Sequence, residues 1–272
     1  MEAAFFDLDK TVIAKASIAA FGGPFRRGGL INRRVVARAV TSQLIFIHLG
    51  ADEERLANIR ESMLELTKGW EAARVRQIVR ETLLETIEPL IYAEALELME
   101  MHRLAGHRVY LVSAAPEEIV LPLAELLGVD GAIASRAELD DEGRYTGKMA
   151  TYNFGPTKAE AMVALAERTG IDLADSWAYS DSYTDLPMLE AVGHPVAVNA
   201  DRALAKLARE RGWEVMQFTK PVRLRDRFTL STQIWTTGIA VAGAGLLVWR
   251  HAHRARTAAR TALPTGRFAR AA

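Results

Sequence analysis

The sequence predicts an α/β fold, in which a helical cap is inserted into a doubly wound parallel sheet. Short apolar runs alternate with helical patterns along most of the chain. Such alternation is typical of βαβ units and of a Rossmann-like parallel sheet. The stretch 14–88 departs from it, because long helical patterns follow one another there without a strand-like run. A chain of 272 residues is long enough to bury a substantial core beneath such an insertion.

The first expected strand is the apolar run 3–6, and Asp7 and Asp9 follow it directly. Ligands of open α/β sheets bind outside the carboxyl ends of the strands, so both acids are expected in one crevice. Neighbouring carboxylates repel each other and favour a bound cation, and hard oxygen ligands suit Mg²⁺. One carboxylate can then attack phosphorus while the other transfers a proton. The alternative is a simple acidic turn after a strand.

The insertion is expected to be a small helical bundle, which covers the site and excludes water. It opens with a Gly-, Pro- and Arg-rich stretch at 21–29, which we interpret as a break between helices. Helical patterns follow at 35–49, 52–67 and 71–88. Several arginines of the cap either read an anionic substrate or lie on a solvated surface. These are Arg26, Arg27, Arg33, Arg34 and Arg38.

The second expected strand, 109–112, lies between helical patterns at 93–104 and 117–127 and ends at Ser113 and Ala114. A hydroxyl at a strand end, followed by a helix that Pro116 opens, provides donors for phosphate oxygens. A turn at 141–144 separates the runs 133–139 and 145–151, which predicts an antiparallel hairpin at the sheet edge.

Two further segments carry charged residues at the expected edge. Lys158 opens the helical run 159–169, although a lone lysine there is usually a solvated surface residue. The run 176–179 reads as a strand and leads to Asp181 and Asp185, four positions apart. Taken alone, this pair also fits a capped helix start. A helix at 201–211 is expected to follow.

Together, the order DxDxT, strand-end serine, lysine and strand-end DxxxD resembles the haloacid dehalogenase (HAD) superfamily. The likeness runs from about residue 3 to residue 218 and is closest to its subfamily IB, the phosphoserine-phosphatase-like branch. It implies a catalytic core at 1–13 and 89–219, with the cap at 14–88.

The resemblance implies an enzyme, a Mg²⁺-dependent phosphomonoester hydrolase that forms an aspartyl-phosphate. Its substrate would be a small phosphorylated metabolite, phosphoserine-like or histidinol-phosphate-like. Mg²⁺ would lie between Asp7, the backbone carbonyl of Asp9, and Asp181. The other implied roles are Asp7 as nucleophile, Asp9 as general acid and base, Ser113, Ala114 and Lys158 as phosphate ligands, and Thr11 and Asp185 in support.

Three alternatives stay open. In the first, Asp9-Lys10-Thr11 is read as the phosphorylation motif of P-type pumps, with Asp9 as nucleophile, but Val12 and Ile13 stand where that motif continues with Gly-Thr. In the second, the enzyme is a membrane-associated phosphatase of lipid phosphates such as lysophospholipids. In the third, the chain is a non-catalytic membrane-associated binding module, against which the intact set of acids and Lys158 argues.

The zero net charge of the chain hides a basic tail, because residues 220–272 contain ten Lys or Arg and one acid. The stretch 228–249 has no charged residue and is long enough to cross a membrane as a helix or to lie on its surface. We therefore expect contact with a membrane or anionic lipid, no nucleic-acid partner, and a cytoplasmic enzyme at the inner face of the cell membrane. The absence of cysteine agrees with a reducing compartment. A strand directly after Met1 and Glu2 leaves no room for a secretory signal.

Overall fold

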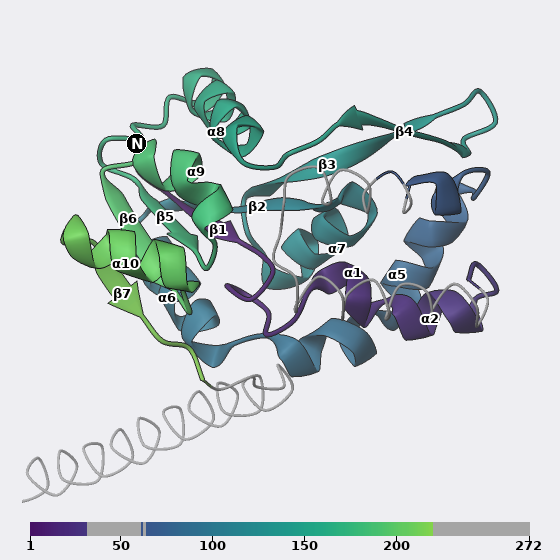
Figure 1. Ribbon diagram of the computed structural model, residues 1–272, viewed down its shortest axis with the longest axis horizontal. Coiled ribbons are helices and arrows are strands. Elements are labelled where there is room, and N and C mark those ends of the chain that lie inside the picture. The colour runs from purple at the N-terminus through teal and green to yellow at the C-terminus, as the bar shows by residue number, and fades with distance from the viewer. Residues whose placement is uncertain (32–60, 62–63, 220–272) are drawn as a thin grey trace, which may run out of the picture. The chain divides into compact units, whose positions relative to one another are not determined.

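The computed structural model describes residues 1–31, 61 and 64–219 of the chain. Within them, seven strands form one sheet in the order β4-β3-β2-β1-β5-β6-β7, and only β4 runs antiparallel to its neighbour (Figure 1). The strands are β1 (Ala3–Asp7), β2 (Arg108–Pro116), β3 (Gly131–Leu139), β4 (Tyr145–Thr151), β5 (Trp177–Ser180), β6 (His194–Val198) and β7 (Glu214–Met216).

Helices connect the parallel strands and cover both faces of the sheet (Figure 1). The doubly wound α/β sheet predicted from the sequence is therefore confirmed. The helices of the core are α6 (Ala93–Leu104), α7 (Glu117–Leu127), α8 (Pro156–Thr169), α9 (Leu186–Glu190) and α10 (Arg202–Glu210), with 3₁₀ turns η1 (Glu88–Leu90) and η2 (Tyr183–Asp185).

The two faces of the central strand explain this layering. Successive side chains of a strand point to opposite faces, and both Phe5 and Phe6 are fully buried in β1. Phe5 belongs to a core that includes Met162 of α8, Met188 of α9 and Leu204 of α10. Phe6 packs edge-on against His102 of α6 on the other face. The chain can bury its central strand only between two layers of helices.

The inserted segment begins with α1 (Ser17–Ala20) and α2 (Gly22–Arg27) and ends with α5 (Ala72–Ile87). The expected break at 21–29 is wrong, because α2 occupies it. Pro24 lies in the first turn of that helix, where its missing N–H costs no hydrogen bond, and Phe25 packs against Trp70.

The helix expected at 71–88 is confirmed by α5, and residues 64–67 of the pattern at 52–67 are helical. The pattern at 35–49 and most of that at 52–67 lie outside the described residues. The limits expected for core and cap, 1–13 with 89–219 and 14–88, stay predictions.

None of the helices described in 1–31 and 64–219 is long and apolar enough to cross a membrane. The apolar helix expected at 228–249 lies outside the described residues, as does the whole basic stretch 220–272. The structure therefore gives the predicted membrane contact no support.

Candidate active site

The carboxyl ends of β1, β2 and β5 bring the predicted site residues to one edge of the sheet. Asp7, the last residue of β1, pairs in register with Val112 of β2, so Ser113 follows at the same level. On the other side, Phe6 pairs with Tyr179 of β5, which places Asp181 just beyond that edge. Asp7, Ser113 and Asp181 are all buried. Strand register therefore brings residues from three separate sequence segments to the same edge of the sheet.

Lys158 joins two of the predicted carboxylates. It lies in the first turn of α8, and its Nζ donates to Asp7 Oδ1 at 2.6 Å and to Asp185 Oδ2 at 2.8 Å. All three side chains are almost fully buried. Burial lowers the pKa of Lys158, but the two carboxylates outweigh it, so the net direction is upward. The lysine is thus a buried, charged residue of the site and not a solvated one.

Burial has the opposite effect on the carboxyl groups of the site, because it raises their pKa values. Burial raises the pKa of Asp7, with Lys158 opposing and Asp185 adding to the rise. Burial also raises the pKa of Asp181 to about 6, although Lys10 Nζ lies 3.6 Å from Asp181 Oδ2 and lowers it. A cation bound at this edge would lower both pKa values, because opposite charge favours the ionised form.

Asp9 is held differently from Asp7. Its Oδ1 accepts a hydrogen bond from the backbone N–H of Ser17 at 2.8 Å. Burial raises the pKa of Asp9, and the backbone N–H and the nearby hydroxyl of Ser17 partly offset that rise. Asp9 is therefore a desolvated carboxyl group that favours binding a proton more than a free aspartate does, as general acid chemistry requires.

The remaining predicted residues lie at the same edge. Ser113 Oγ accepts from the N–H of Ala115 at 3.0 Å, which fixes the turn that also contains the half-buried Ala114. Thr11 is fully buried, and its hydroxyl has no hydrogen-bond partner in the described part of the chain. Its supporting role is therefore still a prediction without a visible contact.

Sequence reasoning missed four residues that contact the site. Ser180 Oγ donates to Asp185 Oδ2 at 2.7 Å, and Ser17 and Lys10 contact Asp9 and Asp181 as described above. Asn199 Nδ2 donates to the backbone carbonyl of Lys10 at 3.4 Å. Lys10 and Asn199 have φ of 64° and 46°, and no other described non-glycine residue has a positive φ. A polar residue at the end of a strand, as Ser180 is in β5, or directly after one, as Asn199 is after β6, was the available signal.

The donor set fits Mg²⁺ on its chemistry. Asp7 and Asp181 are buried and would supply two carboxylates, and the backbone carbonyl of Asp9 is predicted to supply a third oxygen. Among the described residues, no three acidic or histidine side chains gather in a metal-binding arrangement. Mg²⁺ does not need three, because it is usually bound by one or two carboxylates together with water and substrate phosphate. The residues present therefore fit the predicted metal.

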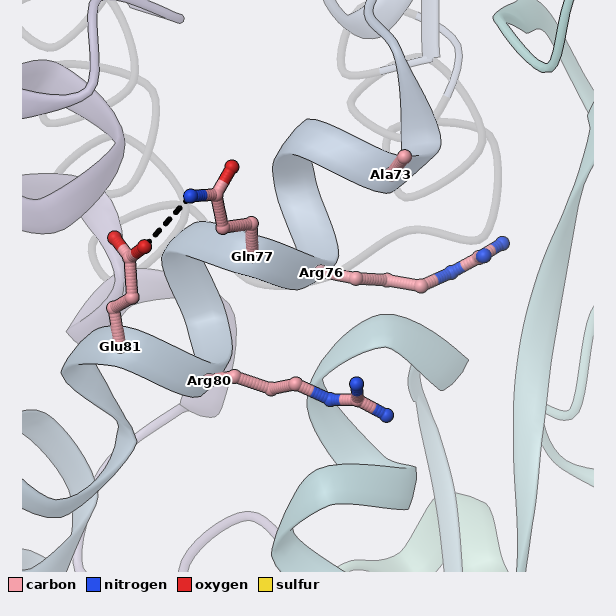
Figure 2. Close-up of a pocket in the computed structure, with 5 residues that line it drawn as sticks. All are labelled: Ala73, Arg76, Gln77, Arg80 and Glu81. Atoms are coloured by element: carbon pink, nitrogen blue, oxygen red, sulfur yellow. Dashed lines mark hydrogen bonds between the residues drawn. The ribbon is translucent and has the colours of Figure 1, made fainter.

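A separate pocket of about 360 Å³ lies along α5 of the inserted segment. Figure 2 shows Arg76 and Arg80 extending to one side of the helix, while Gln77 donates to Glu81 on another. Arg76 approaches the buried Glu118 of α7 at 3.9 Å. None of the catalytic residues predicted from the sequence lines this pocket.

Of the five arginines predicted to read an anionic substrate, only Arg26 and Arg27 belong to the described residues. Arg26 is exposed, and Arg27 is exposed and lies 3.9 Å from Glu85. Arg33, Arg34 and Arg38 lie outside the described residues. A substrate-reading role for these side chains stays a prediction.

Known proteins are similar to this chain in sequence and in fold. The model of the haloacid dehalogenase-like hydrolases matches residues 4–190. A probable phosphatase of Mycobacterium tuberculosis is 48% identical over 252 residues, which cover 91% of this chain and 88% of that protein. A phosphoserine phosphatase of the same organism is 38% identical over 218 residues, covering 79% of this chain and 70% of that protein.

A solved structure has the same fold. It is the phospho-aspartyl intermediate analogue of a phosphoserine phosphatase, with a TM-score of 0.55 at 22% identity, over 84% of this chain and 98% of that one. The family match covers more than half of the chain, including Asp7, Ser113, Lys158 and Asp181. The chain therefore belongs to the haloacid dehalogenase-like hydrolase family and is a phosphatase of that family.

Proposed function

We propose that this phosphatase hydrolyses a small phosphomonoester through an aspartyl-phosphate on Asp7. The observation that carries the proposal is the contact of Lys158 Nζ with Asp7 Oδ1 at 2.6 Å. A cation at that distance from the nucleophile neutralises the charge of an incoming phosphoryl group. Phosphoryl transfer depends mainly on such positioning and charge neutralisation.

In the first half of the reaction, a carboxylate oxygen of Asp7 attacks phosphorus. The bond from phosphorus to the leaving oxygen breaks, and its electron pair stays on that oxygen. The oxygen takes the proton of the Asp9 carboxyl group and leaves as an alcohol. Asp9 suits this role, because burial raises its pKa, so it holds a proton more readily than a free aspartate does.

In the second half, water attacks the phosphorus of the aspartyl-phosphate. The Asp9 carboxylate takes the proton of that water, and the bond from phosphorus to Asp7 breaks. The products are inorganic phosphate, the free carboxylate of Asp7 and a protonated Asp9, which is ready for the next leaving group. Protons and bonds therefore balance over one turnover.

Other side chains hold the phosphoryl group during both steps. Lys158, positioned by Asp185, and Ser113 with the turn at Ala114 supply cationic and polar donors. When bound between Asp7, Asp9 and Asp181, Mg²⁺ would supply further charge neutralisation for the phosphoryl oxygens. Thr11 would help to shape the loop that carries Asp9.

The substrate that relatives suggest is a small amino-acid phosphate. A relative at 38% identity is named a phosphoserine phosphatase, and one at 37% identity over 146 residues is named a histidinol-phosphatase. We propose a phosphoserine-like or histidinol-phosphate-like substrate on that basis. The membrane contact expected for 220–272 and a lipid-phosphate substrate are no part of the proposal, because that stretch lies outside the described residues.

A panel of phosphomonoesters tests the proposal. Phosphoserine, histidinol phosphate, p-nitrophenyl phosphate and detergent-dispersed lysophosphatidate are each incubated with the enzyme, with Mg²⁺ or with excess chelator. Release of phosphate from one of the first two, dependent on Mg²⁺ and lost in Asp7→Asn, supports it. Preference for lysophosphatidate would overturn the substrate class, and full activity in chelator would overturn the metal requirement.

A further inference from the structure

The carboxyl group of Asp9 is held by the first residue of the inserted segment's first helix. The backbone N–H of Ser17 donates to Asp9 Oδ1 at 2.8 Å, and Ser17 is fully buried. Ser17 begins α1, and its carbonyl accepts from the N–H of Phe21, itself fully buried. The donor therefore belongs to an anchored piece of backbone and not to a loose loop.

The base of the insertion fixes the position of this donor. The N–H of Ala14 donates to the carbonyl of Leu90 at 2.8 Å, and the N–H of Tyr92 to the carbonyl of Val12 at 2.9 Å. Ile13 and Ile91 form a further bridge. These contacts join the two ends of the insertion at residues 12–14, which lie between Asp9 and Ser17 in the sequence. The insertion therefore determines where the Ser17 N–H points.

We propose that the backbone N–H of Ser17 is a positioning group for the acid–base step, through which the inserted segment sets the direction of the Asp9 carboxyl group. The proposal rests on the proposed function, in which Asp9 transfers the proton. With Oδ1 occupied by the N–H, the transferable proton resides on Oδ2. The Oδ2–H bond breaks, its electron pair stays on Oδ2, and the proton goes to the leaving oxygen.

The backbone N–H of Ser17 makes the hydrogen bond to Asp9. The buried hydroxyl of Ser17 has no hydrogen-bond partner within the described residues, but it lies near enough to Asp9 to lower the pKa of that carboxyl group. Replacing the side chain therefore leaves the N–H in place, whereas removing the N–H leaves one oxygen of a buried carboxyl group without its donor. Misplacing a catalytic group by about 1 Å can cost on the order of 100-fold in rate.

Proline at position 17 removes the N–H with little backbone strain. It also removes the hydroxyl and places Cδ where the amide hydrogen faced Asp9 Oδ1, so its effect is compared with that of Ser17→Ala, which keeps the N–H. Ala16 has φ −62° and ψ 124°, the extended conformation that a residue before proline adopts. Proline is also well tolerated at the first position of a helix. Ala16→Pro is the matched control, because φ of −62° suits proline and the Ser17 N–H is retained.

The readout is the rate of enzyme phosphorylation in a single turnover, on an alkyl phosphate and on p-nitrophenyl phosphate. An alkoxide leaving group needs the proton from Asp9, whereas p-nitrophenolate leaves without it. We expect Ser17→Pro to lose about 10- to 100-fold on the alkyl phosphate and much less on the aryl phosphate. Ala16→Pro should keep the wild-type ratio of the two rates. Equal losses of Ser17→Pro on both substrates would overturn the proposal.

An amide-to-ester exchange tests the same donor if Ser17→Pro does not fold. Lactic acid at position 17 differs from Ser17→Ala only in replacing N–H by oxygen. The ratio of the alkyl to the aryl rate should therefore be lower in the lactic-acid protein than in Ser17→Ala. An unchanged ratio would overturn the proposal.

Asp9→Asn separates this inference from the proposed function. If Asp9→Asn damages both substrates equally, the acid role of Asp9 is wrong. If it spares the aryl phosphate while the Ser17 variants show no such selectivity, only the role of Ser17 is wrong.

Discussion

Asp185 holds Lys158 in place: its Oδ2 accepts from Lys158 Nζ at 2.8 Å, and both side chains are almost fully buried. Asp185→Asn should lower kcat/KM. Lys158 then has only Asp7 as a charged partner, and its ammonium group stays paired with the carboxylate of the nucleophile. The variant should also lose roughly 1–3 kcal/mol of unfolding free energy, the usual cost of leaving a buried polar group badly paired. Steady-state kinetics and urea unfolding measure the two effects.

Ser180→Ala is the control for that prediction. It removes the hydrogen bond of the Ser180 hydroxyl to Asp185 at 2.7 Å but keeps the charge of the carboxylate. Its kinetic loss should be smaller than that of Asp185→Asn. A larger loss would show that the hydroxyl, and not the ion pair, sets the geometry of the site.

Asp181→Ala should weaken Mg²⁺ binding and activity together. Asp181 is one of two buried carboxylates proposed to hold the metal, and Lys10 Nζ lies 3.6 Å from its Oδ2. Titration with Mg²⁺ should show a higher half-saturating concentration, while Lys10→Met, which retains both carboxylates, should not need more Mg²⁺ than the wild type. Wild-type metal affinity in Asp181→Ala would contradict the assignment.

A histidine pair on the face of the sheet that α6 covers predicts acid sensitivity. His102 Nδ1 lies 2.9 Å from His107 Nδ1, and His102 Nε2 lies 2.7 Å from the Tyr179 hydroxyl. Only one proton fits between the two Nδ1 atoms. Burial, and then His107, lower the pKa of His102 to about 4, whereas an unfolded histidine titrates near 6.5. Between these values the unfolded state binds a proton that the folded state refuses.

The contribution of His102 to the free energy of unfolding should therefore fall as the pH drops from about 6.5 to about 4, by at most about 1.4 kcal/mol per pH unit for one proton. The raised pKa values of Asp7 and Asp181 act in the opposite direction, so the test is the difference between variants. His102→Gln should flatten this dependence, whereas His194→Gln should keep it, because His194 contacts Trp177 and leaves the pair intact. Urea unfolding at several pH values measures the slope. An equal slope in wild type and His102→Gln would contradict the assignment.

Removing residues 220–272 should leave turnover on a small phosphomonoester unchanged. The described body ends with contacts that a cut after Thr219 keeps. Phe218 packs against Tyr92, and its N–H donates to Asn199 Oδ1 at 2.8 Å. A cut after Trp213 also removes β7 and should lower the unfolding midpoint.

The same truncation tests the predicted membrane contact. The full chain should sediment with vesicles containing anionic lipid, and residues 1–219 should not. Release by about 1 M salt, where the Debye length is about 3 Å, would indicate a peripheral basic segment and not a membrane span. Sedimentation of the shorter protein would place the attachment elsewhere.

The sheet and the edge that carries the site residues could be predicted because each signal is local. An apolar run followed at once by an acid marks the end of a buried parallel strand, as at Asp7 and Asp181, whereas Ser113 lies inside β2, which continues to Pro116. The helices expected at 93–104 and 117–127 are confirmed by α6 and α7, which have the same bounds. Parallel pairing then brings these distant segments together without further information.

Other features depend on packing and could not be read from local pattern. The helix α2 forms through Gly22, Gly23 and Pro24 because Phe25 packs against Trp70. The three-residue strand β7 has two exposed side chains and no alternation, so only its pairing with β6 defines it. The contact of Ser17 with Asp9 spans eight positions and is made by backbone, which no side-chain pattern reveals.

The central claim is that Asp7 becomes phosphorylated. Enzyme mixed with an active phosphomonoester is quenched within one turnover and reduced with borohydride, which converts an aspartyl-phosphate to homoserine. Peptide mass spectrometry then locates the change. The account predicts homoserine at position 7, and Asp7→Asn that folds normally but neither labels nor turns over. Homoserine at position 9, or turnover by Asp7→Asn, would contradict it.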